Sequence, residues 1–267
     1  MRFPTLRTAA SALLLAVLPL STTGCDLLGL SDDGGGSSSP SVPESIAFFE
    51  NHPSASALYV TRADTVLAAY NADRKQPLAS TVKYVVAIEY ARQAAAGTIR
   101  PDSLVPLDRI NRFMGLTGPT AKQLHRDWIT QARSAGRVQN GRVPLRTVAR
   151  GMIEFSSNPA TEYLMDLLTL KEINQGLDEI GLASHDPLHY IISDLYVGIQ
   201  KGLRGEERAR FMRDLSAEER ASRAAQIHQK LLQDADSSYR DGLTTPGIAV
   251  QHAWSDHLPV LYRARVR

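Results

Sequence analysis

The sequence contains a single cysteine, Cys25. No disulfide can therefore form within the chain, and a zinc site built from cysteines is excluded. The sequence also lacks an excess of either charge, because 30 basic residues are balanced by 28 acidic ones. It shows no clustered basic stripe of the kind that binds a nucleic acid backbone. These shortages exclude a disulfide-stapled scaffold and favour a protein without a nucleic acid partner.

The apolar run near the N-terminus is too short to cross a membrane. It covers residues 12–20, whereas a spanning helix needs about 20 apolar residues. A short basic region with Arg2 and Arg7 precedes it, and small residues follow it. This order is typical of a secretory signal. We therefore predict that residues 1–24 are a signal peptide and that the protein is exported to the periplasm or the cell surface.

The end of this segment, Gly24-Cys25, resembles a bacterial lipoprotein signal. The resemblance implies lipidation of Cys25 and contact with a membrane only through that lipid. Thr22 stands where such signals usually have an aliphatic residue, and an ordinary cleavable signal is the alternative. Residues 25–45 include Asp-Asp-Gly-Gly-Gly-Ser-Ser-Ser-Pro, which cannot bury apolar surface and predicts a flexible linker.

Residues 46–267 have the composition of a folded domain, and about 220 residues are enough for one sizeable core. Residues 56–63 and 65–70 are predicted as strands joined by a tight turn, and residues 71–77 as a loop. A long helix is predicted for residues 80–96. Its apolar positions indicate a central, well-buried helix; they are Val82, Val85, Val86 and Ile88.

The rest of the domain is predicted to be mostly helical. Apolar spacing and end signals favour helices over residues 144–155, 159–168, 170–180 and 216–235. Two strands alone are marginally stable, so the opening hairpin needs sheet partners. The only candidate strand later in the chain covers residues 248–254.

An S-x-x-K motif, Ser80-Thr81-Val82-Lys83, begins the long helix. A serine hydroxyl is a weak nucleophile until a base takes its proton, and side chains at i and i+3 share a helix face. Burial lowers the pKa of a lysine and lets Lys83 act as that base. The motif alone is weak, since chance produces it roughly once in a chain of this size. The alternative is that Ser80 caps the helix and Lys83 extends to solvent.

The stretch of residues 60–88 that contains this motif resembles class A β-lactamases and their relatives, the DD-peptidases. A second motif, Ser156-Ser157-Asn158, follows in the expected order and is similar to the S-x-N element of that family. The resemblance implies that Ser80 is the nucleophile and Lys83 its base. It also implies that Ser156 relays a proton to the leaving nitrogen and that Asn158 contacts substrate and the lysine. Taken alone, the second motif could also be a helix cap before Pro159.

Two elements of that family are not found in the sequence. The K-[ST]-G motif is absent, and Lys201-Gly202 lacks its middle residue. No glutamate can be assigned to activation of the deacylating water; the candidates lie in a charged helical region and are predicted to face solvent, namely Glu206, Glu207, Glu218 and Glu219. From the resemblance, the residues after Trp254 would lead into the last strands of the fold. We therefore hypothesise a C-terminal truncation, with a shortened family member as the alternative.

Other polar residues have simpler interpretations. His185 and His189 would share a helical face, but no third ligand is nearby, so no metal site and no cofactor is predicted. The mixed charges of residues 208–223 indicate a solvated helix face. Trp128 is predicted to be a packing residue.

The sequence therefore predicts an α+β fold of the β-lactamase/transpeptidase type, with an antiparallel sheet flanked by helices and a large helical subdomain. By resemblance, it is a monomeric serine hydrolase that is acylated on Ser80 and hydrolyses a β-lactam or a related peptidoglycan amide. Three alternatives stay open: a DD-peptidase-like enzyme, a non-catalytic tethered binding protein, and an inactive fragment.

Overall fold

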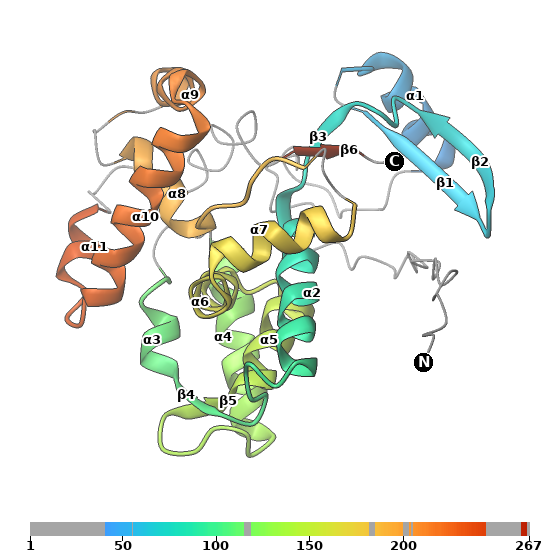
Figure 1. Ribbon diagram of the computed structural model, residues 1–267. Coiled ribbons are helices and arrows are strands. Elements are labelled where there is room, and N and C mark those ends of the chain that lie inside the picture. The colour runs from blue at the N-terminus through green and yellow to red at the C-terminus, as the bar shows by residue number, and fades with distance from the viewer. Residues whose placement is uncertain are drawn as a thin grey trace, which may run out of the picture.

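A computed structural model describes residues 41–54, 56–114, 119–181, 185–199, 203, 205–243 and 263–265. It is mostly helical with small antiparallel sheets, which confirms the predicted α+β class. Figure 1 shows α5 (Leu145–Glu154), α6 (Asn158–Leu168) and α7 (Leu170–Glu179) beside α2 (Val82–Ala95), a second group of helices at the left, and a hairpin with one helix at the upper right. The signal segment, Cys25 and the predicted strand of residues 248–254 lie outside the described residues.

The first helix, α1 (Val42–Asn51), begins inside the range predicted as linker. Its start is a capping box, in which the Ser41 hydroxyl accepts from the Glu44 amide and the Glu44 carboxylate accepts from the Ser41 amide. The predicted hairpin follows as β1 (Leu58–Arg62) and β2 (Thr65–Tyr70), which pair antiparallel. Every residue of β2 is exposed.

The remaining strands are three residues long and form two further pairs among the described residues. β3 (Lys75–Pro77) pairs with β6 (Arg263–Arg265), and β4 (Leu104–Pro106) pairs with β5 (Arg142–Pro144). The prediction of a loop for residues 71–77 was therefore wrong at its end. The error has a physical reason, because three-residue strands show no alternation and their pairing depends on residues far away in the chain.

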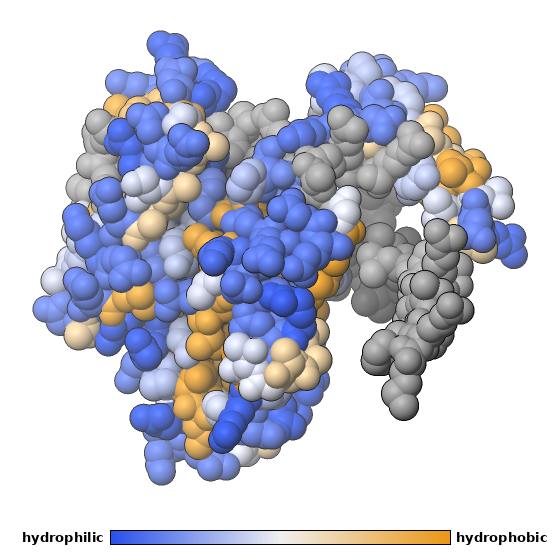
Figure 2. All heavy atoms as spheres, viewed as in Figure 1, coloured by the Kyte–Doolittle hydropathy of each residue, from blue (hydrophilic) through white to orange (hydrophobic). Residues whose placement is uncertain are grey.

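The central helix α2 (Val82–Ala95) follows a 3₁₀ turn (Ala79–Thr81). The turn and the helix together confirm the predicted long helix. α5, α6 and α7 pack against it. Its burial is one-sided: Val82 and Val86 are buried, whereas Tyr84 is 61% and Ile88 45% exposed. The prediction of a central, well-buried helix therefore holds for the first face and was wrong for the second, including Ile88. Figure 2 shows apolar residues reaching the surface of the helical body in several places.

The predicted helices are confirmed. Beside α1 and α2, the helices of the described residues are α3 (Leu107–Asn111), α4 (Pro119–Ser134), α5 (Leu145–Glu154), α6 (Asn158–Leu168), α7 (Leu170–Glu179), α8 (Ile191–Ile199), α9 (Gly205–Asp214), α10 (Ala217–Gln233) and α11 (Ser238–Leu243). α3, α4, α5, α7 and α8 pack against α6, whereas α9 and α10 pack mainly against α8. α10 begins with the capping box of Ser216 and Glu219. None of the helices in the described part of the chain combines the length and apolarity needed to cross a membrane.

Two buried arginines correct the predicted solvated face of residues 208–223. Arg208 is buried, and Arg220 donates two hydrogen bonds from α10 to the buried Asp194 of α8. This ion pair joins two helices with extensive mutual contact. The periodicity of the sequence does not indicate this ion pair, because Asp194 lies 26 residues from Arg220. The glutamates predicted to face solvent are exposed, namely Glu206, Glu207, Glu218 and Glu219.

Candidate active site

Ser80 lies in the 3₁₀ turn that joins β3 to α2. It is half-buried, so its hydroxyl can be reached from outside. The residue before it, Ala79, has φ +45°, a left-handed conformation that is uncommon for residues with a Cβ. Backbone strain of this kind persists only where the surroundings impose it, and it often accompanies functional sites.

Lys83 lies on the first turn of α2 and is 4% exposed. Its Nζ donates to Ser80 Oγ at 3.0 Å, to Ser156 Oγ at 2.9 Å and to Asn158 Oδ1 at 2.7 Å. All three acceptors are neutral oxygens, and no carboxylate of the described residues is hydrogen-bonded to this amine. Burial lowers the pKa of Lys83 to about 7. The side chain therefore does not extend to solvent, and a large fraction of it is a free amine near neutral pH.

The turn between α5 and α6 supplies the other two contacts. Ser156 has φ +50°, and its Oγ donates to Ser80 Oγ at 3.1 Å. Ser157 is the N-cap of α6, with its Oγ accepting from the Ala160 amide. Asn158 is the first residue of α6 and is buried. The motif therefore both caps the helix and contributes to the site: Ser157 caps α6, and Ser156 and Asn158 contact Lys83.

The structure thus brings together the four residues that the sequence singled out. Ser80, Lys83, Ser156 and Asn158 form one hydrogen-bonded group that joins α2 to α6 across 75 residues of sequence. A neutral lysine in contact with two hydroxyls can accept a proton from one and return it through the other. Such a group can activate a serine for attack on a carbonyl carbon.

Sequence reasoning missed a second group, which joins α6 to α10. His228 of α10 contacts Glu162 and Asp166 of α6, each at 3.1 Å. Its ring is stacked on Tyr190, with ring centroids 3.6 Å apart. Burial acts to lower the pKa of His228, but hydrogen bonds and charge from the two carboxylates outweigh burial and raise it to about 9. His228 is therefore a buried cation at neutral pH.

Glu162 also fixes the start of α8. Its carboxylate accepts from the amides of Ile192 and Ser193 and from the Ser193 hydroxyl. A carboxylate at a helix N-terminus is stabilising. Glu162 thus has a structural role, and no simple signal in the sequence distinguishes it from an exposed helical glutamate.

The two histidines considered for a metal do not share a helix. His185 and His189 lie in the segment before α8, and His189 is 3.3 Å from Asp194. The helical-face interpretation was therefore wrong. Among the described residues, no three side chains of His, Cys, Asp or Glu gather closely enough to hold a metal ion.

A helical α+β body with an S-x-x-K turn at the start of its central helix has the features of a β-lactamase-like fold. The sequence profile of the beta-lactamase enzyme family matches residues 44–239. The chain therefore belongs to this family, as the resemblance predicted. Membership supports a β-lactamase-like hydrolase that binds a small-molecule substrate. Comparison of the sequence with curated proteins gave no match.

Proposed function

We propose that the protein is a serine hydrolase of the class A β-lactamase type that is acylated on Ser80. The observation that carries this proposal is the set of three hydrogen bonds from the buried Lys83 to Ser80, Ser156 and Asn158. Burial of a charged amine against neutral oxygens is unfavourable. Ionisable groups whose pKa is shifted in this way are concentrated at functional sites.

The chemistry follows from these contacts. Neutral Lys83 accepts the proton of Ser80 as Ser80 Oγ forms a bond to the carbonyl carbon of the substrate amide. Ser156, which contacts both groups, gives its proton to the departing nitrogen as the carbon–nitrogen bond breaks and takes the proton held by Lys83, which becomes neutral again. Water then releases the acid and restores the Ser80 hydroxyl. The amide of Asn158 orients Lys83 and, by the family resemblance, the substrate.

The substrate class follows from the family and the chemistry. A β-lactam carries an activated amide, and a peptidoglycan peptide carries an ordinary one; both are attacked at the same type of carbon. We propose a β-lactam as the substrate and a DD-peptidase reaction as the second candidate. The two differ in the rate at which the acyl-enzyme is hydrolysed.

The test is acylation measured by intact mass. The chain is incubated with a labelled penicillin, beside a Ser80→Ala variant. A mass increase equal to the penicillin that is absent from Ser80→Ala supports the proposal, and its rapid disappearance identifies a β-lactamase. A persistent adduct with release of D-alanine from a peptide ending in D-Ala-D-Ala identifies a DD-peptidase. A folded protein that forms no adduct and leaves both the penicillin and the peptide unhydrolysed contradicts both and favours a binding role.

We also propose that the protein is exported and tethered through a lipid on Cys25, and that it works as a monomer without a cofactor. The basis is the order of basic, apolar and small residues before Cys25. Incorporation of labelled palmitate into the wild type and not into Cys25→Ser supports the tether, and equal labelling of the two contradicts it.

A further inference from the structure

The Ser156–Asn158 turn needs support, because it carries two site residues and holds one of them, Ser156, in an unfavourable backbone conformation. Ser156 has φ +50°. Such a conformation costs on the order of 1–2 kcal/mol for a residue with a Cβ. The contacts of Ser156 and Asn158 with Lys83 depend on the position of this turn. The residue between them, Ser157, is fully buried and takes no part in those contacts.

Ser157 connects the turn to three other segments. Its amide donates to the Gly151 carbonyl at 3.1 Å, and its carbonyl accepts from Thr161 Oγ1 at 2.8 Å. Its Oγ accepts from the Ala160 amide and lies 2.7 Å from Nδ1 of His125. His125 belongs to α4, a helix that contributes none of the four site residues.

His125 is itself held in one orientation. It is fully buried, and its Nε2 lies 3.0 Å from Oδ1 of Asn111, at the end of α3. The ring also lies 5.3 Å from that of Trp128, one turn along the same helix. Trp128 in turn closes against Gly151, where an added Cβ would lie 2.4 Å from the indole ring. α4 therefore packs directly against the end of α5, from which the turn departs.

The hydrogen bonds select one protonation state of the ring. Asn111 Oδ1 is an acceptor, so Nε2 carries the proton and Nδ1 has a free lone pair. Ser157 can then donate its hydroxyl proton to Nδ1 while its oxygen accepts from Ala160. The hydrogens on His125 Nε2, Ser157 Oγ and the Ala160 amide then each have an acceptor, as burial requires. The opposite tautomer would leave the buried Ser157 hydroxyl proton without this partner.

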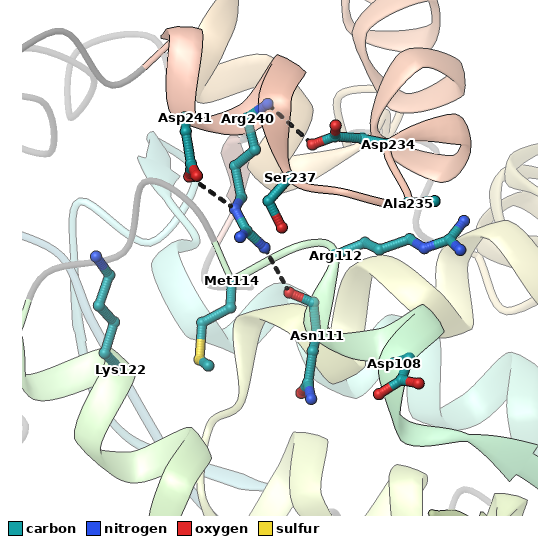
Figure 3. Close-up of a pocket in the computed structure, with 10 residues that line it drawn as sticks. All are labelled: Asp108, Asn111, Arg112, Met114, Lys122, Asp234, Ala235, Ser237, Arg240 and Asp241. Atoms are coloured by element: carbon teal, nitrogen blue, oxygen red, sulfur yellow. Dashed lines mark hydrogen bonds and ion pairs between the residues drawn. The ribbon is translucent and has the colours of Figure 1, made fainter.

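Charge around the ring is consistent with that state. Burial, and to a smaller extent the positive charge of Arg126 on the same helix, lower the pKa of His125 to about 4. Asn111 and Ser157, which face the ring from α3 and α6, are uncharged. Arg240 of α11 donates to the Asn111 carbonyl, and both residues line a polar cavity of about 590 Å³ (Figure 3). His125 and Ser157 do not line this cavity and are fully buried.

We propose that His125 is a positioning residue for the catalytic group. Its Nδ1 accepts a hydrogen bond from the Ser157 hydroxyl, and this bond holds the Ser156–Asn158 turn against Lys83. The proposal rests on the proposed function for its catalytic consequence. Its structural part, that His125 sets the environment of Lys83, can be measured without any turnover.

The test compares two substitutions of nearly equal shape. His125→Asn places an amide oxygen where Nδ1 stood and can still accept from Ser157. His125→Leu has the same branching but no acceptor. We expect His125→Leu to lower the rate of acylation by a labelled penicillin about 10- to 100-fold, because small misplacements of reacting groups have effects of this size. We expect His125→Asn to stay within about threefold of the wild type. Equal loss in both variants, or no loss in either, would overturn the proposal.

A control variant separates positioning from loss of stability. Ile129→Ala, on the same helix, removes buried apolar volume and should lower the free energy of unfolding without moving the turn. Its acylation rate should match the wild type at temperatures where it is folded. If His125→Leu does not fold, Ser157→Ala removes the same hydrogen bond from the other side, and the 10- to 100-fold loss is expected there.

A second measurement does not depend on acylation. The pKa of Lys83 can be followed by NMR of its Cε and Nζ. In His125→Leu a displaced turn admits water to Lys83, so its pKa should rise from about 7 toward its ordinary value. It should stay near 7 in His125→Asn and Ile129→Ala. An unchanged Lys83 pKa in His125→Leu would overturn the proposal. Failure of the wild type to be acylated would contradict only the proposed function.

Discussion

Nζ of Lys83 lies 2.7 Å from Oδ1 of Asn158, and this bond joins the first turn of α2 to the first residue of α6. It orients the amine toward the two serine hydroxyls. Because both side chains are buried, the amine is held among polar atoms that belong to the protein. The proposed proton transfers depend on this placement.

Removal of Lys83 tests its role as a base. We expect Lys83→Ala to lower the acylation rate about 10²- to 10⁴-fold, the usual contribution of a general base. Lys83→Arg keeps a positive charge but cannot lose its proton near neutral pH, so it should lose activity as well. Lys171→Ala, at an exposed position of α7, is the control and should behave as the wild type. An active Lys83→Arg variant would show that only the charge matters.

The pH dependence of acylation follows from the same residue. Only the neutral amine of Lys83 can accept the proton of Ser80, and its pKa is about 7. The rate should therefore rise with pH through 7, level off above about 8 and fall about tenfold per unit below about 6. Single-turnover rates between pH 5 and 9 give the profile. A rate that is constant across this range would contradict the assignment of Lys83 as the base.

His228 predicts a dependence of stability on pH. Its pKa is raised from 6.5 to about 9 in the folded state, so the charged form stabilises the fold. The contribution is complete below about pH 6.5 and is lost as the pH rises through 9; by linkage it is on the order of 3 kcal/mol. Urea unfolding at pH 6 and pH 9.5 measures the difference.

The matched variant for this prediction is His228→Gln. It keeps hydrogen-bonding capacity but has no charge, so it should be less stable than the wild type at pH 6, and the gap should narrow at pH 9.5. Comparison of the two proteins removes the effects of other groups that titrate at high pH. A gap that does not change with pH would mean that the charge of His228 is unimportant.

Gly151 is expected to tolerate no side chain. A Cβ there would lie 2.4 Å from the ring of Trp128, so Gly151→Ala should lower the free energy of unfolding by about 1–3 kcal/mol through overpacking. Gly242→Ala is the control, since its Cβ would meet no atom within 4 Å. Thermal unfolding compares the two. Equal stability of Gly151→Ala and the wild type would show that Trp128 can move aside without cost.

The long elements could be predicted from sequence. Apolar spacing and helix-end signals located α2, α5, α6 and α7, a capping box located α10, and two strand-like runs around the Ala63-Asp64 turn located β1 and β2. Short strands such as β3 and β6 could not be found, because three residues contain no periodicity and their pairing is between distant segments. The exposed face of α2 was also unpredictable, since apolar side chains on a helix do not show which of them find a partner.

For the candidate site, the sequence alone determined the chemistry available and its order along the chain. The S-x-x-K and S-x-N motifs identified Ser80, Lys83, Ser156 and Asn158, because helix geometry relates Ser80 to Lys83 locally and family resemblance relates the two motifs. Only the tertiary structure decided what surrounds them. The burial that lowers the pKa of Lys83, and the contacts of His125 with Ser157 and of His228 with Glu162, join residues 32 and 66 positions apart. Packing between helices creates such contacts, and no local pattern in the sequence records which helices will meet.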